Sequence, residues 1–280
     1  MNDLLVNPAV QSGFIPLVVA LICVFILKRA GWYWSGLAFA IAYFTSVYFT
    51  VGLQLTPLTS TRKTLILAIA AIVLGLVLDV VINVARQKPR VVFGALFAAG
   101  ACAVIWVVWP VASRQEGAEL WLTLLPSMLY AGWITAGTQT LHDKSDEGAM
   151  VALAQGLGTG ISALLGASAL LGQLGIAIGA IAGAYLIMLV FNQEVKLGSN
   201  FTLPIGLLNG LIGVGAVLYA SLPWYTLLPL VLIPATIYIP VTSERSKFFK
   251  LLMLALLTLP LTIIAIVIAW STTGNSEGLY

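Results

Sequence analysis

Charge is what this sequence lacks most. Lys, Arg, Asp and Glu make up only 8% of its 280 residues, whereas hydrophobic residues make up 60%. A soluble globular domain carries about 25% charged residues, so a fold with a water-exposed surface is excluded. Intrinsic disorder is excluded as well, because disordered segments contain few hydrophobic residues. The composition therefore predicts a polytopic integral membrane protein, an all-α bundle of transmembrane helices.

Histidine and cysteine are almost absent. The sequence has one histidine, His142, and two cysteines, Cys23 and Cys102, which both lie inside long apolar runs. Cysteines in such runs usually behave as small core residues with free thiols. No cluster with the spacing of metal ligands remains, so we expect no metal site and no cofactor.

Catalytic and phosphate-binding motifs are also missing. The glycines from Gly156 to Gly160 follow no strand, so they do not match a nucleotide-binding loop. His142 and Asp143 could form an acid–base pair, but no nucleophile or metal cluster accompanies them, and a solvated turn is the favoured interpretation. We therefore expect neither an enzyme nor a nucleic-acid-binding protein.

Long apolar stretches dominate the chain. A helix needs about 20 mostly apolar residues to cross the hydrocarbon core of a bilayer. Ten stretches reach or approach this length, and the short connections leave no room for an inserted soluble domain, so we expect a single transmembrane domain over 1–280. The predicted spans are Gly13–Leu27, Tyr33–Leu55, Thr64–Val84, Val91–Val111, Leu120–Thr138, Ala149–Leu171, Leu174–Asn192, Phe201–Ser221, Trp224–Val241 and Phe249–Trp270. The sequence marks the divisions near Gln173 and near Leu222 least clearly.

Basic residues predict the orientation. Residues 1–13 contain no Lys or Arg, so the basic start of a cleavable signal peptide is missing, whereas Lys28 and Arg29 follow the first apolar stretch. With the N-terminus outside and ten alternating spans, ten basic residues fall inside and three outside. The inner ones are Lys28, Arg29, Arg86, Lys88, Arg90, Lys144, Lys196, Arg245, Lys247 and Lys250, and the outer ones are Arg62, Lys63 and Arg114. This bias fits the positive-inside rule. It predicts that both termini are outside (periplasmic) in a multi-pass protein of the cell inner membrane.

Glycines recur at every fourth position in three neighbouring spans. The sets are Gly156 and Gly160, then Gly175, Gly179 and Gly183, then Gly206 and Gly210. Small residues on one helix face allow close packing in lipid, so we expect the sixth, seventh and eighth spans to form a tight inner cluster. Ten spans also allow an inverted five-plus-five division, 12–138 and 149–271, as in many secondary transporters. No residue-level alignment of the two halves supports that division.

A few polar residues interrupt the apolar spans. Asp79 is the one acidic residue inside a predicted span, and Asn83 and Arg86 follow it on the same helix face. Buried polar groups in a membrane are candidate functional residues. We predict that substrate or ion binding involves Asp79, Asn83, Gln155 and Asn209. The structural alternatives are pairing of Asp79 with nearby basic residues, and hydrogen bonding of the amides between helices.

Prolines concentrate in the predicted ninth span, at Pro223, Pro229, Pro234 and Pro240. An internal proline removes a backbone donor and bends the helix. Broken backbone at membrane depth is tolerated only where it is buried in protein or lines a cavity. We therefore predict that Pro229 and Pro234 act as a hinge or gate.

Two functions remain open. The first is a small secondary transporter or exporter of a small molecule or ion, working by alternating access between helix groups. The second is a non-catalytic membrane subunit or scaffold that packs against protein partners in the lipid bilayer. An enzyme that acts on lipids within the membrane is the least favoured class.

Overall fold

The computed structural model describes residues 7–29, 34, 36–54, 56–82, 88–166, 168–191, 193–239 and 246–273. Within these ranges the chain forms helices joined by turns, without a β-strand. The elements, with η for short π or 3₁₀ segments, are η1 (Val10–Phe14), α2 (Ile15–Leu27), α4 (Leu37–Thr50), α5 (Ser60–Val77), η2 (Leu78–Ile82), α6 (Pro89–Ala112), α7 (Ala118–Gln139), α8 (Ser145–Leu165), α9 (Ala169–Val190), α10 (Ser199–Tyr219), η4 (Trp224–Thr226), α11 (Leu227–Leu232), η5 (Pro234–Tyr238) and α12 (Lys247–Thr273).

Seven of the described helices are long and apolar enough to cross a membrane. They are Val10–Leu27, Ser60–Val81, Pro89–Ala112, Ser145–Leu165, Ala169–Val190, Ser199–Tyr219 and Lys247–Thr273. Two further apolar segments, Leu37–Thr50 and Trp224–Thr236, are shorter. Helix α7 has 22 residues, so its length suffices, but its many Thr, Ser and Gln side chains make it less apolar. The predicted helical class is confirmed, whereas ten crossings stay a prediction.

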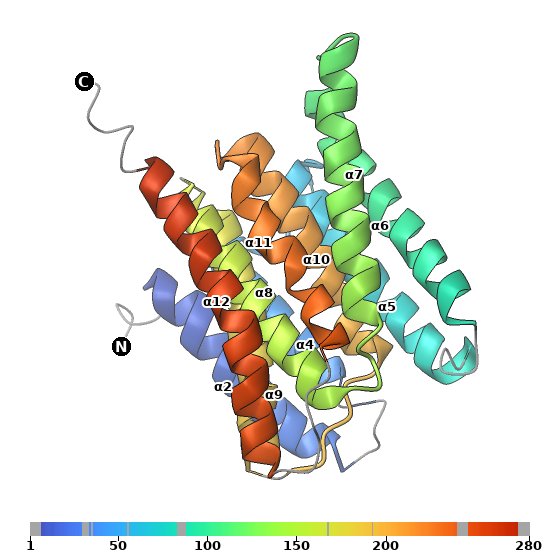
Figure 1. The fold of residues 1–280 in the computed structure, drawn as a ribbon, viewed down its shortest axis with the longest axis vertical. Coiled ribbons are helices and arrows are strands. Elements are labelled where there is room, and N and C mark those ends of the chain that lie inside the picture. The colour runs from blue at the N-terminus through green and yellow to red at the C-terminus, as the bar shows by residue number, and fades with distance from the viewer. Residues whose placement is uncertain are drawn as a thin grey trace.

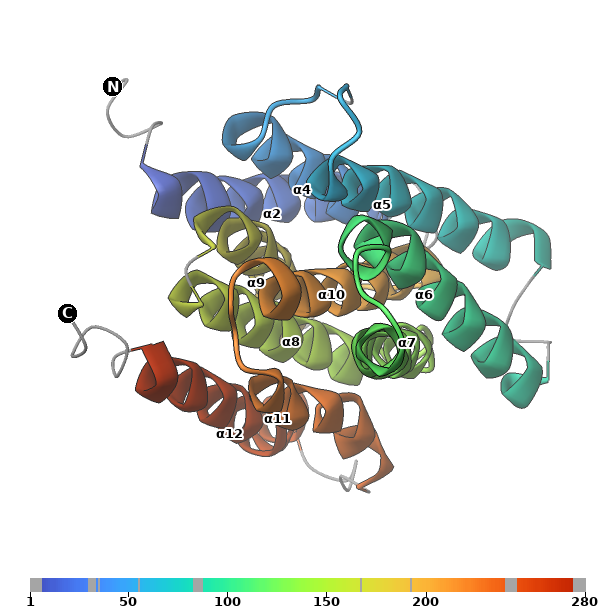
Figure 2. The same ribbon diagram turned by 90° about the horizontal axis from the view of Figure 1, so that it is seen from above.

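The helices pack side by side in layers. Figure 1 shows that the helix axes are broadly aligned, and Figure 2 shows the layers from above. Helices α2, α4 and α5 form one layer, α9 and α10 lie next to it, α8 follows, and α11 with α12 forms the opposite side. Helix α10 is the most enclosed, because every residue from Ser199 to Ala216 is buried.

Contacts between helix ends show that the helices alternate in direction. The Lys28 ammonium, directly after α2, donates a hydrogen bond to the side chain of Gln193, which follows α9. Near the start of α12, Lys250 Nζ lies 3.0 Å from Asp146 Oδ2, in the first turn of α8. The ends of α2 and α9 therefore share one end of the bundle with the starts of α8 and α12. We call it the basic end, because most described lysines and arginines lie there.

The opposite end collects the other helix termini. Ser60, which begins α5, donates a hydrogen bond to the hydroxyl of Tyr219 at the end of α10, with an O–O distance of 3.1 Å. Ser46 of α4 donates one to the carbonyl of Gln11 in η1 at 2.9 Å. In Figure 2 the start of η1 and the end of α12 both lie on the left side. The first and last described helices thus begin and finish at the same end of the bundle.

Glycines bring α8 and α9 into backbone contact. A Cβ atom on Gly156 would lie 2.4 Å from the backbone nitrogen of Gly179, and one on Gly160 would lie 2.4 Å from that of Ile176. The predicted close packing of these two spans is confirmed. The glycines of α10 face α7 instead, since a Cβ on Gly210 would lie 3.0 Å from Ala131 Cα. The predicted inner cluster of these three spans is confirmed, since they are the most buried of the candidate spans and α10 packs against both α8 and α9. The repeated glycines of α10 do not form that contact, because the side of α10 toward α9 carries large aromatic and aliphatic side chains.

One predicted boundary is wrong. The sequence predicts a break near Gln173, but α8 ends at Leu165 and α9 starts at Ala169. Ser168 accounts for the difference, because its hydroxyl caps α9 by accepting a hydrogen bond from the backbone N–H of Leu171 at 3.3 Å. A capping serine inside an apolar run therefore ends the preceding helix earlier than the polar glutamine suggested.

The predicted break after the eighth span is confirmed. The predicted irregular backbone of the ninth span is confirmed as well. Helix α10 ends at Tyr219, and the next segment consists of the 3₁₀ turn η4, the six-residue α11 and the 3₁₀ segment η5. Pro229 lies inside α11 and Pro234 begins η5. Pro240 lies outside the described residues. This part of the chain is the most interrupted of the described helical segments.

Candidate functional site

Asp79 lies at the start of η2, at the basic end, and is buried. Its Oδ1 accepts a hydrogen bond from the backbone N–H of Ser199 at 2.8 Å, and its Oδ2 accepts one from Asn200 at 3.0 Å. These two residues open α10, and the first N–H groups of a helix have no partner within the helix itself. The carboxylate therefore caps α10, and its charge faces the positive end of the helix dipole.

Further side chains complete this cap. Gln139, the last residue of α7, donates from Nε2 to Ser199 Oγ at 2.7 Å and accepts at Oε1 from the hydroxyl of Thr202 at 2.8 Å. Gly198 precedes α10 with a φ of 72°. A Cβ there would lie 2.7 Å from Asp79 Oδ2, so only glycine fits. The cap fixes the start of α10 against α5 and α7.

Asn83 and Arg86 lie outside the described residues. The predicted face shared by Asp79, Asn83 and Arg86 is therefore not described, and an ion site there stays a prediction.

Gln155 and Asn209 lie in the middle of the bundle, each 1% exposed. Gln155 Oε1 accepts a hydrogen bond from the hydroxyl of Thr138 at 3.1 Å. Its Nε2, and both polar side-chain atoms of Asn209, have no hydrogen-bond partner among the described residues. A buried polar group without a partner costs about 1–3 kcal/mol, so these amides are not there to stabilise the fold.

Both amides belong to a stripe of buried polar side chains between α7, α8 and α10, which we call the polar seam. Its members are Tyr130 and Thr138 from α7, Gln155, Thr159 and Ser162 from α8, and Thr202 and Asn209 from α10. On α8 they follow the spacing i, i+4, i+7, which places them on one helix face. The hydroxyl of Ser162 also has no hydrogen-bond partner among the described residues.

Glycines on α10 define where Asn209 lies. A Cβ on Gly206 would lie 3.0 Å from Thr138 Cβ, and one on Gly213 would lie 2.8 Å from the hydroxyl oxygen of Tyr130. Asn209 is three residues after the first glycine and four before the second, so it shares their side of the helix. The seam therefore runs from the capped start of α10, past Asn209, to Tyr130.

The seam is uncharged. None of its seven members ionises at neutral pH, since Tyr titrates near pH 10 in water. Burying a charge without a counter-charge in such a place is far more costly than burying a hydroxyl or an amide. The arrangement is suited to water or to an uncharged polar group rather than to a bare ion.

A cavity of about 420 Å³ lies beside the seam, between α7 and the η4–α11 segment, with α10 behind it. We call it the lateral cavity. It is lined by Phe97 of α6, by Pro126, Ser127, Leu129, Tyr130 and Trp133 of α7, by Val214 and Val217 of α10, and by Trp224, Leu227, Leu228 and Val231. Leu129 and Leu228, at 60% and 52% exposed, form part of its rim. The cavity thus opens to the side of the bundle, where lipid would lie.

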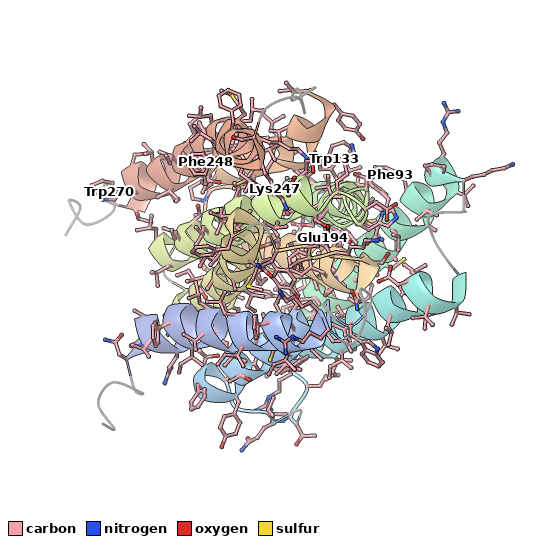
Figure 3. The ribbon with its side chains drawn as sticks, turned by 90° about the horizontal axis from the view of Figure 1, so that it is seen from below. Phe93, Trp133, Glu194, Lys247, Phe248 and Trp270 are labelled. Carbon is pink, nitrogen blue, oxygen red and sulfur yellow. The ribbon has the colours of Figure 1, made fainter. Side chains whose placement is uncertain are left out.

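The prolines predicted to form a hinge belong to the same irregular segment as Leu227, Leu228 and Val231 of the cavity wall, but neither proline lines the cavity. Pro229 is buried in α11, and Pro234 packs on α7, where a Cβ on Gly137 would lie 3.0 Å from Pro234 Cβ. The indole N–H of Trp133 donates to the Val231 carbonyl at 2.9 Å. A carbonyl left free by the irregular backbone is thus bound by α7. Figure 3 shows Trp133 near Phe93 of α6, and their ring centroids are 6.0 Å apart.

The described ranges contain no side-chain group suited to holding a metal ion. No group of three or more His, Cys, Asp or Glu side chains could hold a metal ion there. Cys23 and Cys102 are free thiols. His142 Nε2 does lie 3.0 Å from Asp143 Oδ2, but the Asp143 side chain is 70% exposed. The charged turn also supplies the pairing of Asp146 and Glu147 with Lys250.

Sequence reasoning found part of this site. Asp79, Gln155 and Asn209 stood out as polar residues in apolar runs, whereas the hydroxyl-bearing members of the seam and Gln139 were missed. The i, i+4, i+7 spacing on α8 is a signal that could have found Thr159 and Ser162.

Comparison with known proteins adds no relative. No protein-family model matches the chain, and no curated protein matches it significantly.

Proposed function

We propose that the protein is a small secondary transporter or exporter that moves a small molecule across the cell inner membrane. The observation that carries this proposal is the polar seam, in which the side-chain polar atoms of Asn209, the Ser162 hydroxyl and Gln155 Nε2 have no hydrogen-bond partner among the described residues. Apolar side chains of the same size would spare the desolvation cost of such groups. Polar residues inside a membrane mark substrate pathways by default.

Alternating access needs helix groups that can separate. The contact between α7 and the η4–α11 segment is the weak place, because the lateral cavity lies within it and α11 is only six residues long. Pro229 and Pro234 would act as the hinge there, and the Trp133–Val231 hydrogen bond would hold the closed state. Movement of α11 and α12 against α7 would then expose the seam.

The proposed topology has ten crossings, with the basic end inside and both termini outside. The positive-inside rule supports this, since Arg62, Lys63 and Arg114 are the described basic residues at the opposite end. Helix α4 has 14 residues, about 21 Å of helix, so its flanking turns would complete that crossing.

Asp79 has a defined place in this scheme. By capping α10 it fixes the helix that carries Asn209. The hypothesis that Asp79 and Asn83 also hold a coupling ion stays a prediction.

A release assay tests the proposal. Vesicles with and without the purified protein are loaded with labelled solutes of four kinds: cations, anions, uncharged polar solutes and uncharged amphiphiles. We expect release of at least one kind to be faster with the wild-type protein. The variant Asn209→Leu should release it at the rate of empty vesicles. The control variant Val190→Phe, on an exposed face of α9, should match the wild type.

The membrane-subunit alternative predicts a different result. If no solute is released faster than from empty vesicles, and a stoichiometric protein partner co-purifies in mild detergent, the transporter proposal is wrong.

A further inference from the structure

The lateral cavity and the polar seam meet at one side chain, Tyr130. Its ring lines the cavity, while its hydroxyl oxygen lies against Gly213 of α10, on the seam side. Gly213 leaves room for this ring, because a Cβ there would lie 2.8 Å from both Tyr130 Cε1 and the hydroxyl oxygen. Tyr130 therefore separates an apolar space open to the side from a polar space inside the bundle.

The cavity offers apolar surface. Ser127 donates its hydroxyl to the Thr123 carbonyl at 2.7 Å, and Trp133 donates its N–H to the Val231 carbonyl. These donors are already engaged by the backbone, and the other walls are aliphatic or aromatic, apart from the Tyr130 hydroxyl on its seam side. A volume of about 420 Å³ falls in the range of roughly 300–1,000 Å³ found for small-molecule sites. An occupant would therefore present hydrocarbon to this cavity.

The seam offers the opposite chemistry. Within the described part of the chain, the Asn209 carbonyl oxygen and amide nitrogen and the Ser162 hydroxyl have no hydrogen-bond partner. These groups can donate and accept hydrogen bonds, but no seam member supplies a charge to pair with an ion. A charged group moved there would lose its hydration without compensation.

We propose that the molecule bound is an uncharged amphiphile, taken up sideways from the bilayer. Its hydrocarbon body occupies the lateral cavity, and its hydroxyl or amide head passes the Tyr130 hydroxyl and reaches Asn209. Naming this molecule the transported substrate rests on the proposed function. The binding site itself does not, so it is tested separately from transport.

Trp133 supplies the reporter, because its ring lines the cavity and bromine atoms quench indole fluorescence on contact. Protein in nanodiscs of unbrominated lipid is titrated with 10-bromo-1-decanol. The titration is made in a Trp224→Phe background, because the Trp224 ring also lines the cavity. There we expect a saturable component of quenching that is absent when Trp133→Phe is added. It should also vanish in Val217→Phe, which fills the cavity, and persist in the lipid-facing control Val190→Phe. Quenching that rises without saturation, equally in all variants, would overturn the proposal.

A second titration tests the polar head. 1-Bromodecane has the same chain without a hydroxyl, so it should bind at least about tenfold more weakly, the ratio set by about 1.4 kcal/mol. Asn209→Leu should weaken binding of the alcohol to the level of bromodecane and leave bromodecane unchanged. Equal binding of the two probes would overturn the role of the seam in recognition.

A third arm tests whether the chain comes from membrane lipid. Nanodiscs made with bromine-labelled phosphatidylcholine should quench Trp133 only weakly, and 1-decanol should reduce that quenching. If the brominated lipid quenches Trp133 fully and decanol does not displace it, the occupant is a bilayer lipid and the proposal is wrong.

Binding and transport fail independently. Saturable binding of bromodecanol without release of any solute from vesicles would refute the transporter proposal and leave this site standing. Release of ions or hydrophilic solutes alone, without saturable quenching, would support a transporter and refute the amphiphile.

Discussion

Two buried polar residues of the apolar helices, Asp79 and Asn209, have opposite surroundings. Asp79 has both carboxylate oxygens bound by backbone N–H groups of α10, whereas Asn209 has no hydrogen-bond partner for either side-chain atom among the described residues. The first pattern is that of a structural cap, and the second is that of a group kept for a ligand. The two residues should therefore respond to substitution in opposite ways.

Asp79→Ala should destabilise the protein. It leaves two buried N–H groups of α10 without a partner, at a cost of about 1–3 kcal/mol. Thermal unfolding in detergent measures the loss, with the exposed Asp143→Ala as the matched control. An unchanged midpoint for Asp79→Ala would contradict the capping role. Asp79→Asn separates capping from ion coupling, because coupling requires transport to vanish while most of the stability is retained.

Asn209→Leu should leave stability equal or higher while abolishing transport. The substitution keeps the approximate shape of the side chain and removes a buried amide whose missing hydrogen bonds cost about 1–3 kcal/mol. Unfolding midpoints and solute release are measured on the same preparations. A lower midpoint accompanied by normal release would show that Asn209 is a structural residue.

Some of the candidate residues could be predicted from the sequence, and others were missed. Asp79, Gln155 and Asn209 could be predicted because charged and amide groups are rare in apolar spans. Thr138, Thr159 and Ser162 were missed, because hydroxyls are tolerated on any helix face by bonding back to the preceding turn. The spacing on α8 was the one sequence signal for Thr159 and Ser162. Only the packing of the helices shows that these hydroxyls belong to the polar seam.

Among the elements, α8 and α9 show a sequence pattern that predicts packing. Gly156 and Gly160 recur at the spacing of one helix face, and both lie against the backbone of α9. The same spacing on α10 did not reveal that its glycines face α7, because glycine spacing predicts a smooth helix face but not the helix that covers it. For the same reason the boundary at Ser168 was misplaced, since only the structure shows the hydroxyl capping α9.

Gly156→Ala should therefore be costly. The added methyl would lie 2.4 Å from the backbone nitrogen of Gly179, where no flexible side chain can move aside. Overpacking of this kind costs about 1–3 kcal/mol. Gly183→Ala on α9 is the matched control, because its Cβ would meet only side-chain atoms at 3.7 Å or more. Equal unfolding midpoints for the two variants would contradict the close approach of α8 and α9.

The irregular η4–α11–η5 segment shows a similar limit. Its prolines predict broken backbone, and the structure confirms it. They do not predict that Trp133 of α7 binds the Val231 carbonyl, because that contact joins residues 98 positions apart in the chain.

For the whole molecule, the central feature is the uneven distribution of charge between its two ends. Glu116 lies in the exposed turn between α6 and α7, and Asp143 lies in the turn between α7 and α8 at the basic end. In a background with Cys23→Ala and Cys102→Ala, we expect Glu116→Cys to react with an impermeant maleimide in intact cells. Asp143→Cys should react only after permeabilisation. The reverse pattern would invert the proposed orientation.

The proposed function requires that solute can reach the polar seam. In the same cysteine-free background, Asn209→Cys is treated with a small water-soluble thiosulfonate in vesicles, beside Ala182→Cys in the fully buried apolar part of α9. We predict that the cysteine at position 209 reacts clearly faster than the one at position 182, and that filling the lateral cavity with Val217→Phe slows it. If both cysteines are equally unreactive, the seam is closed packing and the account is wrong.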